Sequence, residues 1–442
     1  MRTVIGKMKS FFLTTMLVVL GLSAKAELAV TADASFCRFA SSYFSTHRTG
    51  DYLDSAKYLY WPTLNIHCYE DSRGGGGIQE ANEGRLEREG LAQWANGSQF
   101  WGEIWADDNG GYDTNAVVQN VTNTFRAPLW FFNGTAYTNE GGWANSHTVH
   151  WIGFGAIPYT NNVVEGCAES IRNNAMTNAA ARFAFQSIDI FHPLLVWSND
   201  LMSGANTLRF GTPDLTHPGP PGNLDMAIVA AQSMMDTNIN TCIIDYGRAR
   251  VSVVQHCAVS SVSLAGNSLS FTWRADRHSM AWDQPDGTIT NDASQALLKT
   301  NAFYEVLVIT NIPNGSYHVF EDGSNIYSAA VKNNSLTVNL FNITRGALWA
   351  QRKEVLGRIR DKRGCDRVTL VDSGMLGETA YNGDSQTQWD AGLRGDALVS
   401  ALATDIANLN AKDAAIWSAA QPTNHTIRIS IIPPPQNFRF TN

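Results

Sequence analysis

The stretch that decides the fold runs from Thr212 to Ala227 and reads TPDLTHPGPPGNLDMA. It places Asp214 three residues before His217, in a Pro- and Gly-rich loop that leads into an apolar-faced helix expected at residues 224–235. Acyl transfer needs a histidine as general base and a carboxylate that orients the imidazole and stabilises its charged form. One rigid turn of this kind can supply both groups. A surface loop in which Asp214 caps a helix is the competing interpretation.

Strand-like and helix-like segments alternate upstream of this loop. The expected strands are 28–31, 64–69, 100–106, 127–132 and 187–191, and the expected helices include 79–94 and 163–185. The alternation predicts an α/β fold with a parallel sheet that helices cover on both faces. In such sheets, ligands bind at the carboxyl ends of the strands.

The second half of the chain changes character. Period-2 runs such as 269–273 and 304–310 are bounded by turns, among them Asp322-Gly323, and predict a small antiparallel β domain. From residue 346 the pattern is helical again, and the sequence does not show which domain this extension packs on. The predicted domains are a signal peptide at 1–26, an α/β domain at 27–237, an antiparallel β domain at 238–345 and a helical C-terminal extension at 346–442.

The loop around His217 resembles the terminal Asp-x-x-His block of the GDSL/SGNH hydrolases, and residues 188–193 (IDIFHP) resemble the strand that comes before this block. The resemblance covers about residues 28–236. It implies a three-layer α/β/α sandwich that hydrolyses esters without a metal or other cofactor. It also implies that His217 is the general base and that Asp214 orients it.

The nucleophile of this family is the serine of a Gly-Asp-Ser turn after the first strand. The corresponding stretch here is Ala32-Asp33-Ala34-Ser35, so Ala34, which has no hydroxyl, occupies the nucleophile position. Three interpretations stay open. Either Ser35 acts as a substitute nucleophile in a shifted turn, or the chain is a catalytically disabled esterase, or the alignment of these residues with the family motif is mistaken.

Two further family blocks would stabilise the oxyanion. Four glycines at 74–77 follow the second expected strand, where the family has a glycine that donates a backbone N–H, and Gly76 is our candidate among them. Residues 107–109 (Asp-Asp-Asn) follow the third, and Asn109 is the candidate there because only an amide can donate to an oxyanion. A flexible turn at 74–77 and a calcium loop at 107–113 are the alternatives, although the latter does not match EF-hand spacing.

The amino-terminal residues have the pattern of a signal peptide. Arg2, Lys7 and Lys9 precede an apolar run at 11–22, and Ala24-Lys25-Ala26 fits a cleavage site. We expect cleavage after Ala26, a secreted or periplasmic mature protein, and no membrane association after cleavage. The net charge is −8, with 32 Lys and Arg against 40 Asp and Glu and no basic run, so nucleic-acid binding is not expected.

Cysteines, histidines and tryptophans outside the blocks have simpler interpretations. An oxidising compartment permits disulfides among the six cysteines, and Cys242 and Cys257 could staple a hairpin. We interpret His147, His150 and His192 as loop or core residues, because none has an organised carboxylate or thiolate partner in the sequence. Trp143, Trp151 and Trp197 either line a cleft or pack in the interior.

Together these patterns predict an exported serine-type ester hydrolase. Export and the 13 tryptophans favour an acetyl ester, carried by an acylated polysaccharide, as substrate. The alternative is a non-catalytic carbohydrate-binding or surface-interaction protein on the same scaffold. The missing serine favours this alternative, and the presence of both Asp214 and His217 disfavours it.

Overall fold

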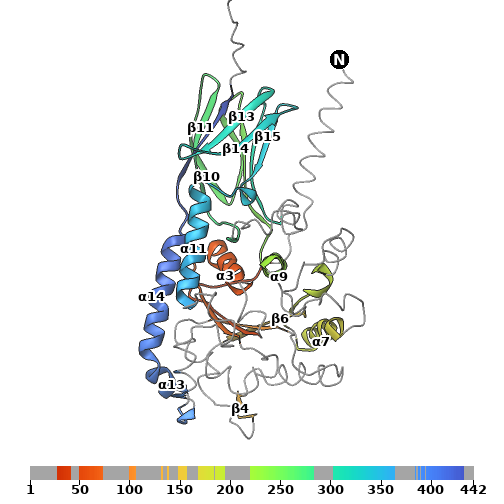
Figure 1. Ribbon diagram of the computed structural model, residues 1–442, viewed down its shortest axis with the longest axis vertical. Coiled ribbons are helices and arrows are strands. Elements are labelled where there is room, and N and C mark those ends of the chain that lie inside the picture. The colour runs from red at the N-terminus through yellow and green to blue at the C-terminus, as the bar shows by residue number, and fades with distance from the viewer. Residues whose placement is uncertain are drawn as a thin grey trace, which may run out of the picture.

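The computed structural model describes residues 27–40, 49–72, 99–105, 131–132, 137–138, 148–156, 168–183, 185–194, 220–282, 302–363, 384, 387–388, 390–393 and 395–432. Figure 1 shows an α/β part with a β sandwich at one end and the helices α11 and α14 along one side. The expected signal peptide at 1–26 and the expected helix at 79–94 lie outside the described residues.

One sheet forms the centre of the α/β part. Its five strands are β1 (Ser35–Ala40), β2 (His67–Ser72), β3 (Gln99–Trp105), β6 (Thr148–Phe154) and β7 (Gln186–Ile188). All neighbouring strands are parallel, in the order β2-β1-β3-β6-β7. This is the 2-1-3-4-5 order of a doubly wound sheet, in which the strand order reverses between β1 and β3.

The strands are buried on both faces, as parallel strands require. Every residue of β3 is buried, and rings stack between strands, with the Phe36 and Trp101 centroids 5.9 Å apart. Gly102 of β3 leaves room for Trp151 of β6, because a Cβ at this position would collide with the indole. The expected fold class of a parallel α/β sheet is therefore confirmed.

Helices lie against both faces of this sheet. The helix α3 (Thr49–Tyr60) packs beside α9 (Pro220–Met234) on the face that carries Glu103, which contacts Lys57 of α3. Side chains alternate between faces along a strand, so Gly153 faces the other way from Ile152, the register partner of Glu103. Gly153 lies against Met176 of α7 (Ala168–Phe183). None of the helices described here is long and apolar enough to cross a membrane.

The β sandwich consists of two sheets. One has the order β10-β11-β16-β13-β14 and the other β15-β12-β8-β9. Their strands are β8 (Asn238–Asp245), β9 (Arg250–Gln255), β10 (Cys257–Ala265), β11 (Ser268–Ala275), β12 (Tyr304–Thr310), β13 (Gly315–Glu321), β14 (Ser324–Val331), β15 (Ser335–Asn339) and β16 (His425–Ile431). The remaining short elements are β4 (Phe131–Phe132), β5 (Tyr137–Thr138) and η3 (Leu340–Asn342). Alternate residues face one shared core, as in β12 with its period-2 burial.

Two expectations for the second half are corrected. The β region is not purely antiparallel, because β8 and β12 pair in parallel. The C-terminal part is not purely helical either, because β16 lies between β11 and β13. The helices α11 (Ala347–Arg363) and α14 (Ala403–Ala420) pack on each other and on α3, and the short α13 (Gly395–Ala401) comes before α14. The C-terminal part of the chain therefore joins both regions.

The first strand is not where the sequence predicted it. Residues 28–31 form no strand, and the Leu28 amide donates to the Met234 carbonyl at the end of α9. The first strand begins at Ser35 instead, and the sequence analysis missed β6 altogether. Of the expected strand at 127–132, only Phe131–Phe132 is described, as part of a two-stranded ribbon.

The cysteines that the structure describes are free thiols. These are Cys37, Cys68, Cys242 and Cys257, so the expected staple between the last two is not formed. Burial, followed by the neighbouring Cys257, raises the pKa of the Cys242 thiol to about 12. A thiol that stays protonated is a poor nucleophile, which disfavours oxidation at this position. Cys167 and Cys365 lie outside the described residues.

Candidate functional site

The carboxyl ends of the parallel strands form one row across the sheet. Ala40 pairs with Ser72, and Phe39 with Ile104, so Ala40 lies beside Trp105. Trp105 pairs with Phe154, which pairs with Ile188 at the end of β7. Doubly wound sheets bind ligands outside these ends, where the strand order reverses. The carboxyl edge between β1 and β3, where the strand order reverses, is therefore the candidate site.

Two helices begin beside each other at this site. The Thr49 hydroxyl, at the first residue of α3, donates to the Asn223 side-chain oxygen of α9 at 2.8 Å, and both side chains are buried. Because α3 connects two parallel neighbours, it begins near the carboxyl end of β1. The hydrogen bond therefore joins the first residue of α3 to the beginning of α9.

Ala34 and Ser35 do not belong to this edge. The Ala34 carbonyl accepts the amide of His67, the first residue of β2, at 2.9 Å, so both residues lie at the amino ends of their strands. At a rise of about 3.3 Å per residue, Ser35 is roughly 16 Å from Ala40. Ser35 is fully buried, and its hydroxyl has no hydrogen-bond partner in the described part of the chain. The expectation that a strand ends before Ala34 is wrong, and no substrate can reach Ser35.

The other predicted site residues lie outside the described residues. They are Gly76, Asn109, Asp214 and His217. The glycines at 74–77 come soon after Ser72, and Asn109 comes four residues after Trp105. The strands that precede these residues, β2 and β3, thus end in the row described above.

Sequence reasoning missed one acid–base pair at this edge. Asp189 directly follows β7, and its Oδ2 lies 2.7 Å from Nδ1 of His192. The Asp189 Oδ1 also accepts the backbone N–H of His192 at 3.0 Å. The expectation that His192 lacks an organised carboxylate partner is therefore wrong. The sequence itself contained a signal for this pair, because Asp189 and His192 have the same Asp-x-x-His spacing as Asp214 and His217.

His150 and Trp151 are packing residues. The His150 ring stacks on Trp101 at a centroid distance of 4.6 Å, and burial lowers the pKa of the imidazole. Trp151 is buried in the sheet. His147, Trp143 and Trp197 lie outside the described residues.

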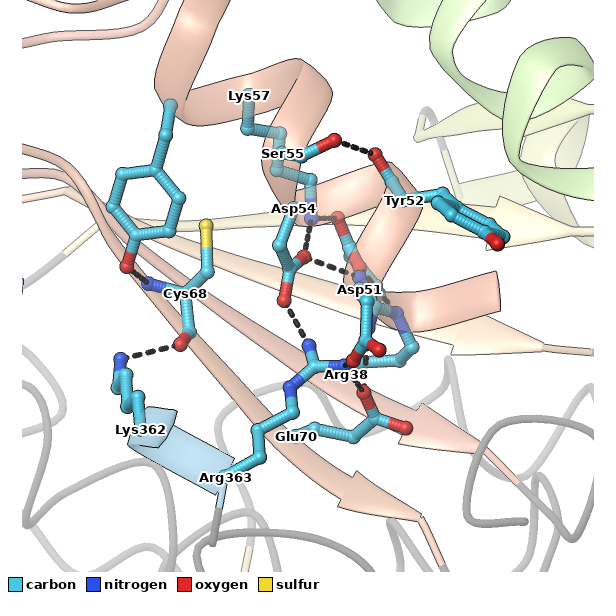
Figure 2. A network of polar contacts seen from close by, with 12 residues as sticks. Arg38, Asp51, Tyr52, Asp54, Ser55, Lys57, Cys68, Glu70, Lys362 and Arg363 are labelled. Carbon is cyan, nitrogen blue, oxygen red and sulfur yellow. Dashed lines mark hydrogen bonds and ion pairs between the residues drawn. The ribbon is translucent and has the colours of Figure 1, made fainter. Parts of the chain in front are cut away.

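Charged side chains fill the middle of the same sheet, beneath α3 (Figure 2). Arg38 of β1 has Glu70 of β2 and Glu103 of β3 as its direct cross-strand neighbours. Its guanidinium donates to Glu70 at 2.9 Å, to Glu103 at 3.1 Å and to Asp54 of α3 at 2.6 Å. All four residues are buried. The guanidinium thus holds three acids from three elements.

Within this buried charge network, Arg38 and Asp54 are held in their charged forms. Burial alone would lower the pKa of Arg38, but the carboxylates of Asp54, Glu103 and Glu70 raise it above its ordinary value. Burial alone would raise the pKa of Asp54, but Arg38, Arg363 and Lys57 hold it well below its usual range. Each charge is therefore compensated by neighbours that the fold fixes in place.

The C-terminal helix α11 completes the network from the side (Figure 2). Arg363 donates to Asp51 at 2.7 Å, pairs with Glu70 at 2.9 Å and contacts Asp54. Lys362 donates to the Cys68 carbonyl at 2.6 Å and to Asp413 of α14 at 2.8 Å. These contacts attach both C-terminal helices to the sheet and leave none of these ions exposed to a ligand.

The start of α3 approaches this network closely at Gly50. A Cβ at this position would collide with the side chains of Glu70, Arg38 and Arg363. Glycine is therefore required for close approach, and it brings the beginning of α3 to the same half of β1 and β2 that leads to the carboxyl edge.

The sheet order defines a doubly wound α/β protein with an attached β sandwich. No protein-family model matches the chain, and no curated protein matches it. Among solved structures, it is similar to a gut microbial diltiazem-metabolizing enzyme, with 14% sequence identity and a TM-score of 0.63. That match covers 92% of this chain and 100% of the other. At this identity, the similarity shows a shared fold.

Two further similarities cover smaller parts of the chain. One is to the acetyl xylan esterase AlAXEase, with 14% identity, 45% of this chain, 98% of that chain and a TM-score of 0.33. The other is to a variant of the acetylxylan esterase Axe2 from Geobacillus stearothermophilus, with 10% identity, 47% of this chain, 96% of that chain and a TM-score of 0.33.

Proposed function

We propose that the protein is an exported serine-type ester hydrolase of the GDSL/SGNH kind. The single observation that carries the proposal is the Thr49–Asn223 hydrogen bond at the candidate site. It joins the beginnings of α3 and α9, the two helices that follow the expected nucleophile segment and the Asp-x-x-His loop. The bond supports the proposal because it joins the beginnings of the two helices that follow the segments expected to supply the catalytic groups.

The corrected position of β1 gives the nucleophile a new candidate. In the family motif, Gly-Asp-Ser comes at the end of the first strand, and β1 ends at Ala40. The sequence continues Ser41-Ser42, so Ala40-Ser41-Ser42 matches the motif at its last position. Ser42 therefore replaces Ala34 as the proposed nucleophile, and Ser41 is the neighbouring alternative. Both lie outside the described residues, two residues or fewer from the end of β1.

His217 remains the proposed general base, with Asp214 as its orienting carboxylate. His217 comes three positions before Pro220, the first residue of α9, and a chain spans at most about 3.6 Å per residue. His217 is therefore within about 11 Å of the beginning of α9. This supports the proposal, because Asn223 in the first turns of α9 is bonded to Thr49 of α3.

The proposed reaction is a two-step acyl transfer. The Ser42 oxygen attacks the ester carbonyl carbon while its proton passes to His217, and the alcohol leaves with that proton. Water then attacks the acyl-enzyme and gives a proton to His217, which passes it to the Ser42 oxygen as the bond between this oxygen and the acyl carbon breaks and the acid leaves. The Asn109 amide and a backbone N–H of the 74–77 loop, with Gly76 as candidate, would donate hydrogen bonds to the oxyanion.

The substrate is proposed to be an acyl ester of a hydroxyl-rich alcohol, such as an acetylated polysaccharide. The 13 tryptophans and the signal-peptide pattern support this substrate class. The fold that nearly the whole chain shares with a diltiazem-metabolizing enzyme is one that carries enzymatic activity. The non-catalytic alternative rested on an alanine in the nucleophile position. That argument no longer holds, because Ala34 lies at the opposite end of β1.

The test is hydrolysis of 4-nitrophenyl acetate by the chain from residue 27 onward. We expect turnover by the wild type, and a loss of about 10⁴-fold or more in kcat for Ser42→Ala and for His217→Ala. A fluorophosphonate probe followed by peptide mass spectrometry should label Ser42. Labelling of Ser41 instead would identify Ser41 as the nucleophile.

Matched variants at the other end of β1 provide the control. Ser35→Ala and Ala34→Ser should leave esterase activity unchanged, because both positions are buried at the amino edge. If the wild type is inactive and only Ala34→Ser gains activity, the corrected strand position does not define the site. If no variant and no ester gives turnover, the hydrolase proposal fails.

A further inference from the structure

We infer that Asp189 and His192 form a binding pair for the alcohol part of the ester, a hydroxyl-rich group such as a sugar. The inference rests on the proposed function, because it names the substrate group that this end of the same edge binds. Both side chains are well exposed, at 43% for His192 and 44% for Asp189. They lie directly after β7, in the row of carboxyl ends that begins with β1 and β2.

The pair is held in one orientation. The Asp189 carboxylate contacts the Nδ1 edge of the imidazole at 2.7 Å, and the buried Phe191 ring lies edge-on to the imidazole at a centroid distance of 5.3 Å. A carboxylate at Nδ1 favours the tautomer with the proton on that nitrogen, which makes Nε2 a hydrogen-bond acceptor. An oriented imidazole and a carboxylate are groups that bind the hydroxyls of a sugar.

Distance separates this pair from the proposed nucleophile. Adjacent strands lie about 4.8 Å apart, so β7 is roughly 10 Å from β3 and roughly 14 Å from β1. A general base must come within about 3 Å of the hydroxyl that it deprotonates. The pair thus suits a substrate group some distance from the scissile bond, rather than proton transfer at the serine.

Hydroxyl groups continue the polar surface beside the pair. The Ser187 hydroxyl of β7 and the Thr177 hydroxyl of α7 lie 3.5 Å apart in an exposed contact. A carboxylate, an imidazole and two hydroxyls therefore occur around one end of one strand. This setting contrasts with the buried charge network, whose ions are enclosed.

A purely structural role for Asp189 is the competing explanation. Its Oδ1 accepts the His192 amide at 3.0 Å, which is the hydrogen bond of a capping residue at the turn formed by residues 191–194. Capping uses one carboxylate oxygen, whereas the other contacts the imidazole. Asparagine also caps well, so Asp189→Asn keeps the cap and removes the charge.

The experiment compares two substrates with one acyl group. For an acetylated xylo-oligosaccharide, we expect His192→Ala and Asp189→Asn to raise KM about tenfold with kcat within about twofold of wild type. For 4-nitrophenyl acetate, which lacks the sugar, neither constant should change. His192→Gln, which places an amide near the Nε2 position, should recover part of the affinity, and His192→Asn should not. His318→Ala, in the β sandwich, is the control histidine.

The outcomes separate this inference from the proposed function. Equal losses of kcat on both substrates would make His192 a catalytic base and overturn the inference, as would an unchanged KM for the oligosaccharide. If the wild type hydrolyses neither ester, the proposed function fails, and calorimetric titration with unacetylated xylo-oligosaccharide then tests the pair alone. Binding that His192→Ala weakens would support it, and equal or absent binding in both proteins would overturn it.

Discussion

The middle of the parallel sheet and its carboxyl edge carry ionisable side chains in opposite settings. In the middle, Arg38 is fully buried and contacts three carboxylates from two strands and one helix. At the edge, Asp189 and His192 form one exposed pair at the end of β7. The first set is enclosed by α3 and α11, and the second is accessible to a ligand (Figure 2 shows the first).

The comparison shows that the position of a charged side chain along a strand determines its role. Ions in the interior lose their hydration and are tolerated only with fixed partners, so they act as attachment points between elements. Ions at the carboxyl edge keep access to water and to substrate. We therefore expect changes in the middle to reduce stability and changes at the edge to reduce activity.

The largest effect is expected for Arg38→Ala. Removing this cation leaves Asp54, Glu70 and Glu103 buried with fewer partners, which should lower the free energy of unfolding by about 3–5 kcal/mol. Guanidinium chloride unfolding followed by tryptophan fluorescence measures it. Arg248→Ala is the control, because its side chain is 78% exposed and its removal should cost less than about 0.5 kcal/mol. Similar small losses in both variants would contradict the comparison.

Gly50→Ala, in the same part of the protein, should have a smaller effect on stability than Arg38→Ala. The added methyl group collides with Glu70, Arg38 and Arg363, and overpacking of this kind costs about 1–3 kcal/mol. Gly357→Ala in α11 is the matched control, because its Cβ meets nothing within 4 Å. That substitution should stabilise the protein by about 0.5–1 kcal/mol. Thermal unfolding of both variants distinguishes a tight contact from a general intolerance of alanine.

The pH dependence of stability distinguishes the buried His278 from the buried charge network around Arg38. Burial, followed by the charges of Arg352 and His425, holds the pKa of His278 well below its ordinary value of 6.5. Below pH 6.5 the unfolded chain binds a proton at His278 that the folded chain does not. The unfolding free energy should therefore fall by up to about 1.4 kcal/mol per pH unit until the folded pKa is reached.

His278→Phe should weaken the dependence of the unfolding free energy on pH between pH 6.5 and 5, as urea unfolding at several pH values would show. An unchanged pH dependence in this variant would mean that a group other than His278 titrates.

The buried charge network responds at lower pH. The pKa of Asp54 is depressed from 3.8, so its stabilisation is present above pH 3.8 and is lost as pH falls below that value toward the folded pKa.

The smallest effect is expected for Ser35→Ala at the amino edge. A buried hydroxyl without a partner costs free energy, so its removal should leave stability equal or raise it by about 1 kcal/mol. Differential scanning calorimetry measures the change. A loss of more than about 1 kcal/mol would indicate a bond that this hydroxyl makes in solution.

Several elements were predictable because their signal is local. The period-2 run YEVLVIT predicted β12 at its observed bounds, Tyr304–Thr310, and the apolar-faced stretch after His217 predicted α9 to within a few residues. The Asp-x-x-His spacing is equally local, and it also occurs at Asp189 and His192, where the structure describes the pair. Such patterns depend on neighbours within one or two turns of chain.

By contrast, the sequence did not predict the position of β1, because its charged residue is compensated only by partners that are distant in the sequence. Arg38 in the middle of SFCRFA looks unfavourable for a buried strand, and three acids that are 16 to 65 residues away make it acceptable. The first strand was therefore expected at the apolar residues 28–31, and Ala34 was interpreted as the nucleophile position.

By itself, the sequence determined the parallel α/β class of the first half, the β-strand character of most of residues 238–345, and the spacing of acid and base residues. The tertiary structure decided the strand order, the insertion of β16 between β11 and β13, and which residues follow strands at the carboxyl edge. Periodicity records which face of an element is buried. Pairing between segments as far apart as Ser268 and Ser430 depends on long-range contacts that no local pattern specifies.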